Sequence, residues 1–77
     1  MNNVTVYTTT HCPFCAMLKN FLNGQNIPYR EVNVERDPAM MRKLFATTGQ
    51  IGVPQTEING KWVIGFDPEG IMQALQN

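Results

Sequence analysis

The sequence predicts a small α/β domain in which a four-stranded mixed sheet is flanked by three helices. Two observations predict this class. Strand-like apolar runs and helix-like apolar spacing follow one another in the order β-α-β-α-β-β-α. The first strand–helix–strand unit favours a parallel pair of strands, whereas a tight turn near the C-terminus favours an antiparallel pair. We therefore expect a mixed sheet with helices on both of its faces.

The first strand and the first helix lie on either side of a pair of cysteines. Val4–Thr8 is β-branched or aromatic throughout, which is typical of a buried strand. The helix that follows is expected to end at Asn23-Gly24, because glycine readily stops a helix. Its apolar face is predicted from residues at helical spacing: Phe14, Met17, Leu18, Phe21 and Leu22.

The second strand is expected over residues 29–34, followed by a helix that begins at Asp37. An aspartate can accept hydrogen bonds from the first free amides of a helix, and Pro38 suits the first helical position. This helix should end near Gly49. Its predicted buried side consists of Met40, Met41, Leu44 and Phe45.

The last third of the chain predicts a hairpin and a helix. Gln55–Ile58 and Lys61–Ile64 read as strands, and the Asn59-Gly60 pair between them is the strongest hairpin signal in the sequence. The third helix should begin at Asp67, which is again followed by a proline. Its inward residues are predicted to be Ile71, Met72 and Leu75.

Size and charge exclude several classes of function. The chain has 77 residues, enough for one domain, which we expect to span residues 1–77. Its six basic and six acidic side chains cancel without forming runs, which argues against a nucleic-acid partner or an anionic membrane surface. No apolar stretch is long enough to span a membrane, and the N-terminus lacks the features of a signal peptide. We expect a cytoplasmic monomer.

The segment Cys12-Pro13-Phe14-Cys15 is the most informative feature of the chain. It falls at the start of the first predicted helix, where free amides and the helix dipole lower the pKa of a nearby thiol. Helical geometry leaves Cys12 at the exposed tip and turns Cys15 inward. We therefore predict that Cys12 is the attacking thiolate and Cys15 the resolving thiol.

Metal binding is the alternative interpretation of the two cysteines. A tetrahedral zinc site needs four ligands, and the chain offers only His11 in addition. A dimer could complete such a site or bridge an iron–sulfur cluster without any turnover. In a chain expected to be cytosolic, redox chemistry is the favoured interpretation, so we expect no metal site.

The whole chain resembles a glutaredoxin-like protein of the thioredoxin superfamily. Cys12-Pro13-Phe14-Cys15 is close to the CPYC of that family, and Val53-Pro54 stands where the family has TVP. Val6-Tyr7-Thr8 precedes the cysteines, and Gly65 with Asp67 matches a glycine–aspartate motif. The resemblance implies a thioredoxin-like (glutaredoxin) fold and a glutathione-dependent thiol–disulfide oxidoreductase. Its substrates would be protein disulfides and glutathione mixed disulfides, with glutathione as co-substrate and no tightly bound cofactor.

The sequence also departs from the family pattern. Thr9 stands where glutaredoxins commonly carry a lysine that helps to hold a glutathione carboxylate, and Gly52 replaces the threonine of TVP. The run Gly65-Phe66-Asp67-Pro68 resembles redoxins that are reduced by thioredoxin reductase and donate electrons to ribonucleotide reductase. Such a redoxin is the alternative function, with those two enzymes as partners.

The resemblance also implies roles around the cysteines. Pro54 is expected to follow a cis peptide bond, so that Val53 presents its N–H and C=O to a target chain. Asp67 either caps its helix or receives the γ-glutamyl end of glutathione with the adjoining amides. Gln50 is a candidate for the other carboxylate. The expected substrate or glutathione site comprises His11, which would stabilise the thiolate, Phe14 as an apolar ledge, Gln50, Val53, Pro54, Gly65, Phe66 and Asp67.

Overall fold

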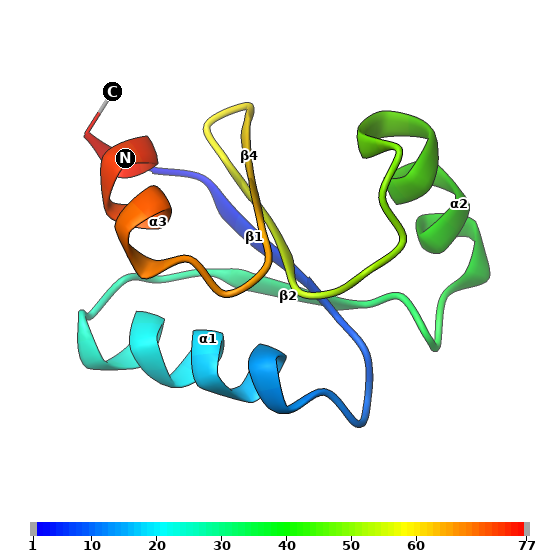
Figure 1. Cartoon of the computed structure of the whole chain (residues 1–77), viewed down its shortest axis with the longest axis horizontal. Helices are drawn as coiled ribbons and strands as arrows, with labels where there is room; N and C mark the ends of the chain where they lie inside the picture. The colour runs from blue at the N-terminus through cyan, green and yellow to red at the C-terminus, as the bar shows by residue number, and fades with distance from the viewer. Residues whose placement is uncertain (1, 77) are drawn as a thin grey trace.

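The seven predicted elements follow one another in the predicted order (Figure 1). The structure is a computed structural model that describes residues 2–76. Its strands and helices are β1 (Val4–Thr8), α1 (Pro13–Gly24), β2 (Arg30–Asn33), α2 (Pro38–Thr48), β3 (Gln55–Ile58), β4 (Lys61–Ile64) and α3 (Pro68–Leu75). None of the helices within these residues is long and apolar enough to cross a membrane.

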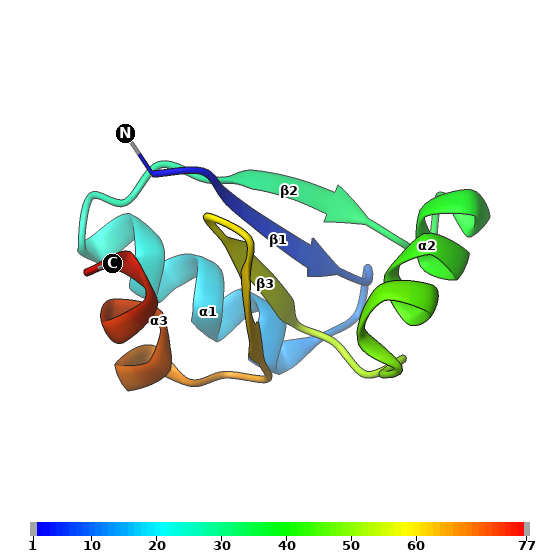
Figure 2. The same cartoon turned by 90° about the horizontal axis from the view of Figure 1, so that it is seen from above.

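The four strands form one mixed sheet in the order β2-β1-β3-β4, with the strands crossing the middle of the molecule (Figure 2). β1 and β2 pair in parallel, whereas β1–β3 and β3–β4 are antiparallel. The register places Tyr7 of β1 opposite Val32 on one side and Gln55 on the other. The central strands β1 and β3 carry their C-terminal and N-terminal ends, respectively, to the edge of the sheet where the cysteines lie.

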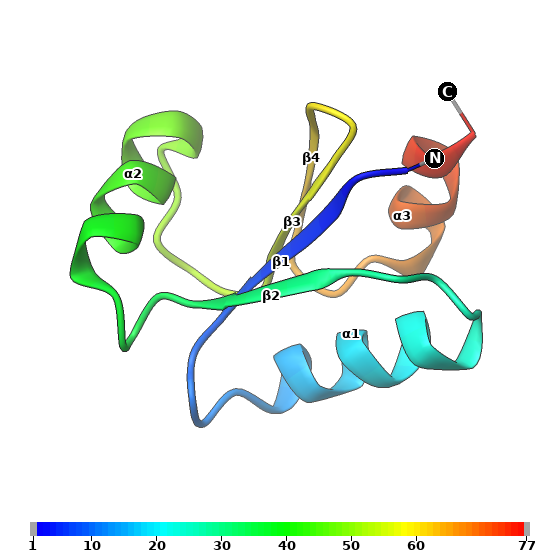
Figure 3. The same cartoon turned by 180° about the vertical axis from the view of Figure 1, so that it is seen from behind.

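Helices cover both faces of the sheet, as predicted. α1 and α3 lie on one face and α2 on the other, which the opposite views in Figures 1 and 3 show. Two apolar clusters correspond to these faces. The larger one contains Val4, Val6, Leu18, Leu22, Ile58, Val63, Ile71 and Ala74. The smaller one, on the side of α2, is built on Tyr7, Val34 and Leu44.

The predicted helix starts are confirmed. The carboxylate of Asp37 accepts a hydrogen bond of 3.2 Å from the Met40 amide, and that of Asp67 accepts one of 3.0 Å from the Gly70 amide. A proline follows each aspartate at the first helical position. These contacts satisfy amides that a helix N-terminus otherwise leaves without partners.

The hairpin signal is also confirmed, because Asn59 and Gly60 have φ angles of 53° and 86°. Two positive φ angles in succession give the turn whose twist suits adjoining antiparallel strands.

Three residues predicted to face inward are instead exposed. Met17 of α1 is 45% exposed, Phe45 of α2 is 51% exposed and Met72 of α3 is 39% exposed. Each short helix touches the sheet along a narrow line, which in α1 passes through Cys15, Leu18 and Leu22. Residues at the margins of a broad apolar stripe then remain in solvent, and Ala74 takes the inward place expected for Met72.

Candidate active site

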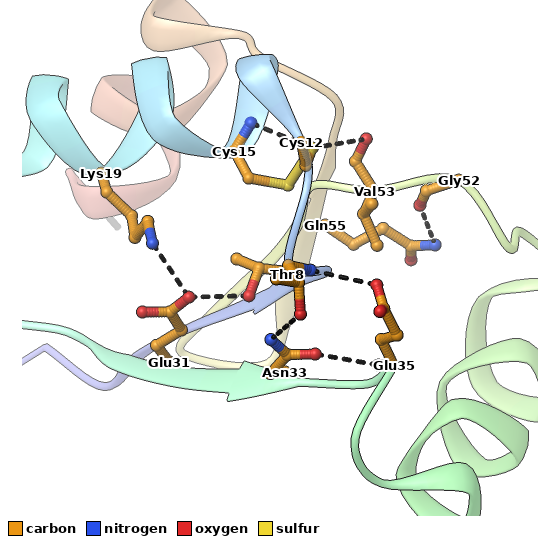
Figure 4. The surroundings of a disulfide bond; sticks show 11 residues. Thr8, Cys12, Cys15, Lys19, Glu31, Asn33, Glu35, Gly52, Val53 and Gln55 are labelled. Carbon is orange, nitrogen blue, oxygen red and sulfur yellow. Dashed lines mark hydrogen bonds and ion pairs between the residues drawn. A yellow bond between two sulfur atoms is a disulfide. The ribbon is translucent and has the colours of Figure 1, made fainter.

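Cys12 and Cys15 are joined by a disulfide bond at the N-terminus of α1 (Figure 4). Their Cα atoms are 5.1 Å apart, within the usual range for such a bond. Cys12 is the N-cap residue of α1, and Pro13 occupies the first helical turn as predicted. The first strand is therefore followed, after a short loop, by a disulfide-bonded pair of the C-x-x-C type at the start of α1.

The two sulfur atoms are in different environments. Cys15 is 2% exposed, whereas Cys12 is only partly buried. The backbone amide of Cys15 donates a hydrogen bond of 3.1 Å to the Cys12 sulfur, and the first turn of α1 contains no acidic residue. A donor and the positive end of a helix dipole both favour a negative charge on Cys12 after reduction. This asymmetry agrees with an accessible attacking sulfur and a buried resolving one.

The segment before β3 faces the disulfide. The Val53–Pro54 peptide bond is cis, as expected, and the Val53 carbonyl oxygen lies 3.9 Å from the Cys12 sulfur. The sulfur carries no proton in the disulfide, so this approach is a contact rather than a hydrogen bond. Pro54 is buried while Val53 is half-buried. The Val53 backbone thus lies beside the sulfur that a target would approach.

A groove of about 320 Å³ adjoins this contact and has uncharged walls. Its lining residues are Phe14, Val53, Pro54, Gly65 and Phe66. Phe14 is 58% exposed and offers its ring to solvent between the two cysteines. Also in the lining, the Gly65 amide donates a hydrogen bond of 2.8 Å to the Pro54 carbonyl, and Gly65 has a φ of 79°. Five of the sequence-predicted site residues are therefore brought together.

The other three predicted site residues lie outside this groove. Asp67 lines a different hollow, along β4 and α3, and its Oδ1 atom is occupied by the helix cap. Gln50 is exposed, and its backbone carbonyl rather than its side chain takes part in a hydrogen bond near the site. His11 is exposed in the loop before Cys12 and has no hydrogen bond to the other described residues.

Thr9, which stands where the resembled family commonly has a lysine, lines a second hollow of about 330 Å³. This hollow is also lined by Lys19 and Arg36, so two cationic side chains stand beside the Thr9 position. Lys19 is already paired with Glu31, since its ammonium nitrogen lies 3.0 Å from the carboxylate.

A polar network under α1 was not anticipated from the sequence. The buried Thr8 hydroxyl donates a hydrogen bond of 2.7 Å to Glu31, which Lys19 also contacts (Figure 4). The hydrogen bond from Thr8 and then the proximity of Lys19 hold the pKa of Glu31 below its usual value, against the opposing effect of partial burial. The network joins β1, β2 and α1 below the disulfide.

Gln55 was also missed as a site residue. Its side chain is fully buried, and its amide nitrogen donates hydrogen bonds of 2.9 Å to the carbonyls of Gln50 and Gly52. A polar residue at the start of a predicted strand, directly after Pro54, was the signal that could have identified it. Among residues 2–76, no three His, Cys, Asp or Glu side chains gather in a way that could hold a metal ion.

Comparison with known proteins gives one consistent family. The glutaredoxin family model matches residues 4–63. A glutaredoxin of Neisseria meningitidis serogroup B is 36% identical, covering 100% of this chain and 99% of the relative. An uncharacterized glutaredoxin-like 8.6 kDa protein, in the rubredoxin operon of Clostridium pasteurianum, is 30% identical over 95% of this chain and 97% of its own.

Solved structures with the same fold include a thioredoxin-like protein, BC3987, with a TM-score of 0.87 and 34% identity over 95% of this chain and 100% of that one. A buckwheat glutaredoxin in complex with glutathione has a TM-score of 0.80 and 25% identity, over 97% and 74% of the two chains. The glutaredoxin-like NrdH-redoxin of Escherichia coli, described as having a thioredoxin-like activity profile, has a TM-score of 0.84 over 92% of each chain. At 24% identity, that last likeness shows the fold alone.

Proposed function

This chain belongs to the glutaredoxin family and is a thiol–disulfide oxidoreductase, and from that premise we propose that it reduces protein disulfides and glutathione mixed disulfides with glutathione as the reductant. Cys12 is the attacking sulfur and Cys15 the resolving sulfur. One observation supports the assignment of roles. Cys12 is partly exposed and its sulfur accepts a hydrogen bond from the backbone amide of Cys15, whereas the Cys15 side chain is buried.

The reaction follows from the two sulfur atoms. The reduced Cys12 thiolate attacks one sulfur of the target disulfide, forming a mixed disulfide and releasing the other sulfur as a thiolate. Cys15 then loses its proton to solvent and attacks Cys12, which releases the second target thiolate and forms the Cys12–Cys15 disulfide. Two glutathione molecules restore the dithiol and leave as glutathione disulfide, so two electrons pass in each cycle. With a glutathionylated target, Cys12 can act without Cys15. Cys12 then takes the glutathione from the target as a mixed disulfide, and a free glutathione attacks this disulfide, which restores Cys12 and releases glutathione disulfide.

The uncharged groove suits a polypeptide target. Phe14 and Phe66 offer apolar contact within the groove, and the Val53 backbone, which also lines it, lies beside the Cys12 sulfur. An extended segment next to a disulfide can pair with such a backbone while its side chains meet the aromatic walls. These features support protein disulfides as substrates.

Glutathione needs polar contacts in addition, since it carries two carboxylates. Support comes from the buckwheat relative, which binds glutathione, and from Arg36 in the hollow beside the Thr9 position, where Lys19 is already paired with Glu31. In the first turn of α3, Pro68 has no N–H and the Gly70 amide is bonded to Asp67, so the Glu69 amide is the donor left there for the γ-glutamyl end.

A redoxin reduced by thioredoxin reductase, and donating electrons to ribonucleotide reductase, is the second candidate function. The specific observation in its favour is that none of the five groove residues beside Cys12 is charged. A groove of this kind can bind another protein without holding either carboxylate of glutathione.

Two parallel couplings test the choice of reductant. NADPH consumption is measured with hydroxyethyl disulfide as the final acceptor, once with glutathione and glutathione reductase and once with thioredoxin reductase alone. Turnover through glutathione supports the proposal, whereas turnover only through thioredoxin reductase overturns it in favour of the second candidate. The Thr9→Lys variant sharpens the test, because the added cation should lower the KM for glutathione if the tripeptide binds beside position 9.

A further inference from the structure

The side chain of Gln55 connects the loop of residues 50–53, which faces the active site, to the central strand β3 through hydrogen bonds. Gln55 lies in β3, where its backbone is paired with Tyr7 of β1 and Ile64 of β4. From this fixed position its amide nitrogen reaches back along the chain and donates to the carbonyls of Gln50 and Gly52, both at 2.9 Å (Figure 4 shows the bond to Gly52). One side chain therefore holds two points of the loop.

The orientation of this amide is determined by its neighbours. A flipped amide would place its oxygen against two carbonyl oxygens, which offer no donor. In the orientation found, both hydrogens of the nitrogen are used, while the oxygen is buried and has no partner among residues 2–76. The polar interactions of this side chain are therefore its two donor bonds, and both of them attach the loop to the sheet.

The exposed part of the loop, before Val53, has few other attachments. Gln50, Ile51 and Gly52 are all exposed, and Ile51 is 67% exposed. At its far end, the Gln50 amide donates to the Thr48 hydroxyl, which ties the loop to the end of α2 rather than to the sheet. The bonds from Gln55 therefore hold the chain on the N-terminal side of Val53, while the hydrogen bond from Gly65 to Pro54 holds it on the C-terminal side.

Val53, which follows directly, has backbone groups available for a partner. No hydrogen bond among residues 2–76 uses its amide, and its carbonyl oxygen is approached only by the Cys12 sulfur, at 3.9 Å. A target chain that pairs with this backbone would be aligned with the attacking sulfur. The Val53 side chain packs against the cluster around Tyr7, and the Gly65 amide holds Pro54. Gln55 supplies the remaining constraint, on the N-terminal side of Val53.

We propose that Gln55 is a positioning residue for polypeptide substrates. By holding the loop, it keeps the Val53 backbone in the position where a target segment can pair with it beside Cys12. The inference rests on the proposed thiol–disulfide exchange at Cys12. It adds a distinction between substrates: Gln55 matters for a disulfide carried on a peptide chain and not for a small disulfide that has no peptide backbone.

The test compares insulin, a protein disulfide, with hydroxyethyl disulfide, with dithiothreitol as reductant in both assays. Gln55→Met keeps the approximate length and volume of the side chain but removes both donors. We expect its KM for insulin to rise about tenfold, the factor expected for the loss of one to two hydrogen bonds, with kcat for hydroxyethyl disulfide unchanged. Gln55→Asn, whose amide is too short to reach both carbonyls, is the second variant and should show the same defect.

Thr56→Val is the matched control, because Thr56 is the next residue in β3, is equally buried and also has an unpartnered polar atom. Its KM for both substrates should equal that of the wild type. Two direct readouts accompany the kinetics. The rate of Cys12 alkylation in the reduced protein should be unchanged by Gln55→Met, whereas the backbone order parameters of residues 51–53 should fall.

An unchanged KM for insulin in a folded Gln55 variant would overturn the proposal. An equal loss for both substrates, or a slower alkylation of Cys12, would also overturn it, because Gln55 would then act on the sulfur chemistry. Failure of the wild type to reduce either substrate would instead refute the proposed function, so the two failures can be told apart.

Discussion

The Cys15 amide and the Cys12 sulfur are joined by a hydrogen bond of 3.1 Å, so one cysteine supports the other through its backbone while its own sulfur stays buried. This contact does not depend on the Cys15 side chain. The environment of Cys12 should therefore survive the removal of the Cys15 sulfur, which makes the two roles separable by mutation.

We expect Cys12→Ser to abolish all activity, because no other accessible thiol can attack a target. Cys15→Ser should retain turnover with a glutathionylated peptide and lose most of its activity with insulin, where resolution needs the second thiol. Rates with these two substrates, measured side by side, check the assignment. Equal inactivity of both variants with the glutathionylated peptide would show that the roles are wrongly assigned.

Asp67 has a structural role as a helix cap and a proposed role in binding glutathione. Asp67→Ala should lower the free energy of unfolding by about 1 kcal/mol through loss of the cap, which corresponds to roughly 4–8 °C in Tm for a domain of this size. Asp37→Ala is the matched control, since Asp37 caps α2 in the same way. Thermal unfolding should show similar losses in both.

Kinetics separate the two roles of Asp67. If glutathione binds at the first turn of α3, only Asp67→Ala should raise the KM for a glutathione mixed disulfide, and the Asp37 variant should not. Identical KM values in the two variants would leave Asp67 as a cap alone.

Glu31 gives the stability of the protein a dependence on pH. Its pKa is lower in the folded state than the ordinary value of 4.5, so its stabilising contribution is present above that value and is lost as the pH falls through the folded pKa. Because the carboxylate is more than one-third exposed, we expect a contribution of only about 0.5 kcal/mol. Urea unfolding of the wild type and Glu31→Gln between neutral and acidic pH should show a difference that disappears in acid.

The hydrogen bond from Thr8 is the main cause of the shift at Glu31, ahead of the effect of Lys19. Thr8→Val should therefore reduce this pH dependence more than Lys19→Met does. The reverse order would mean that the exposed ion pair, rather than the buried hydroxyl, stabilises the carboxylate.

Gly65 should be intolerant of a side chain although there is room for one. No atom lies within 4 Å of the position that a Cβ atom would occupy, yet φ is +79°, which other residues adopt only with strain. Gly65→Ala should lower the free energy of unfolding by roughly 1–2 kcal/mol. Gly24→Ala is the control, since Gly24 has equal space and no positive φ, and it should be neutral or slightly stabilising in urea unfolding. Equal effects of the two substitutions would contradict this explanation.

The order of the strands and helices could be predicted because each boundary has a local chemical cause. Asp37 and Asp67 accept hydrogen bonds from helix amides, and Asn59 with Gly60 adopts the backbone angles of a hairpin turn. The direction in which each helix faces could not be predicted equally well. Met17 belongs to the apolar stripe of α1 but lies outside its line of contact with the sheet, and sequence spacing alone does not locate that line.

At the active site, the prediction succeeded where neighbours in sequence determine the geometry. Cys12 caps the start of α1, and Cys15 lies in its first turn, which begins at Pro13. Val53 directly precedes Pro54, and the peptide bond between them is cis. The contacts of Thr8 and Gln55 were missed because they depend on distant partners. Thr8 meets Glu31 only through the register of β1 and β2, and the reach of Gln55 depends on how the preceding loop folds back.

The first turn of α1 contains no acidic residue, so no carboxylate there opposes a negative charge on reduced Cys12. If reduction leaves Cys12 as a thiolate and Cys15 as a thiol, the protein takes up two electrons and one proton and gains one negative charge. Since its acidic and basic side chains balance, that single charge alters the migration of the protein in an electric field. Native isoelectric focusing should resolve the oxidised and reduced forms as two bands. The fraction of each form in a mixture can then be measured from the band intensities.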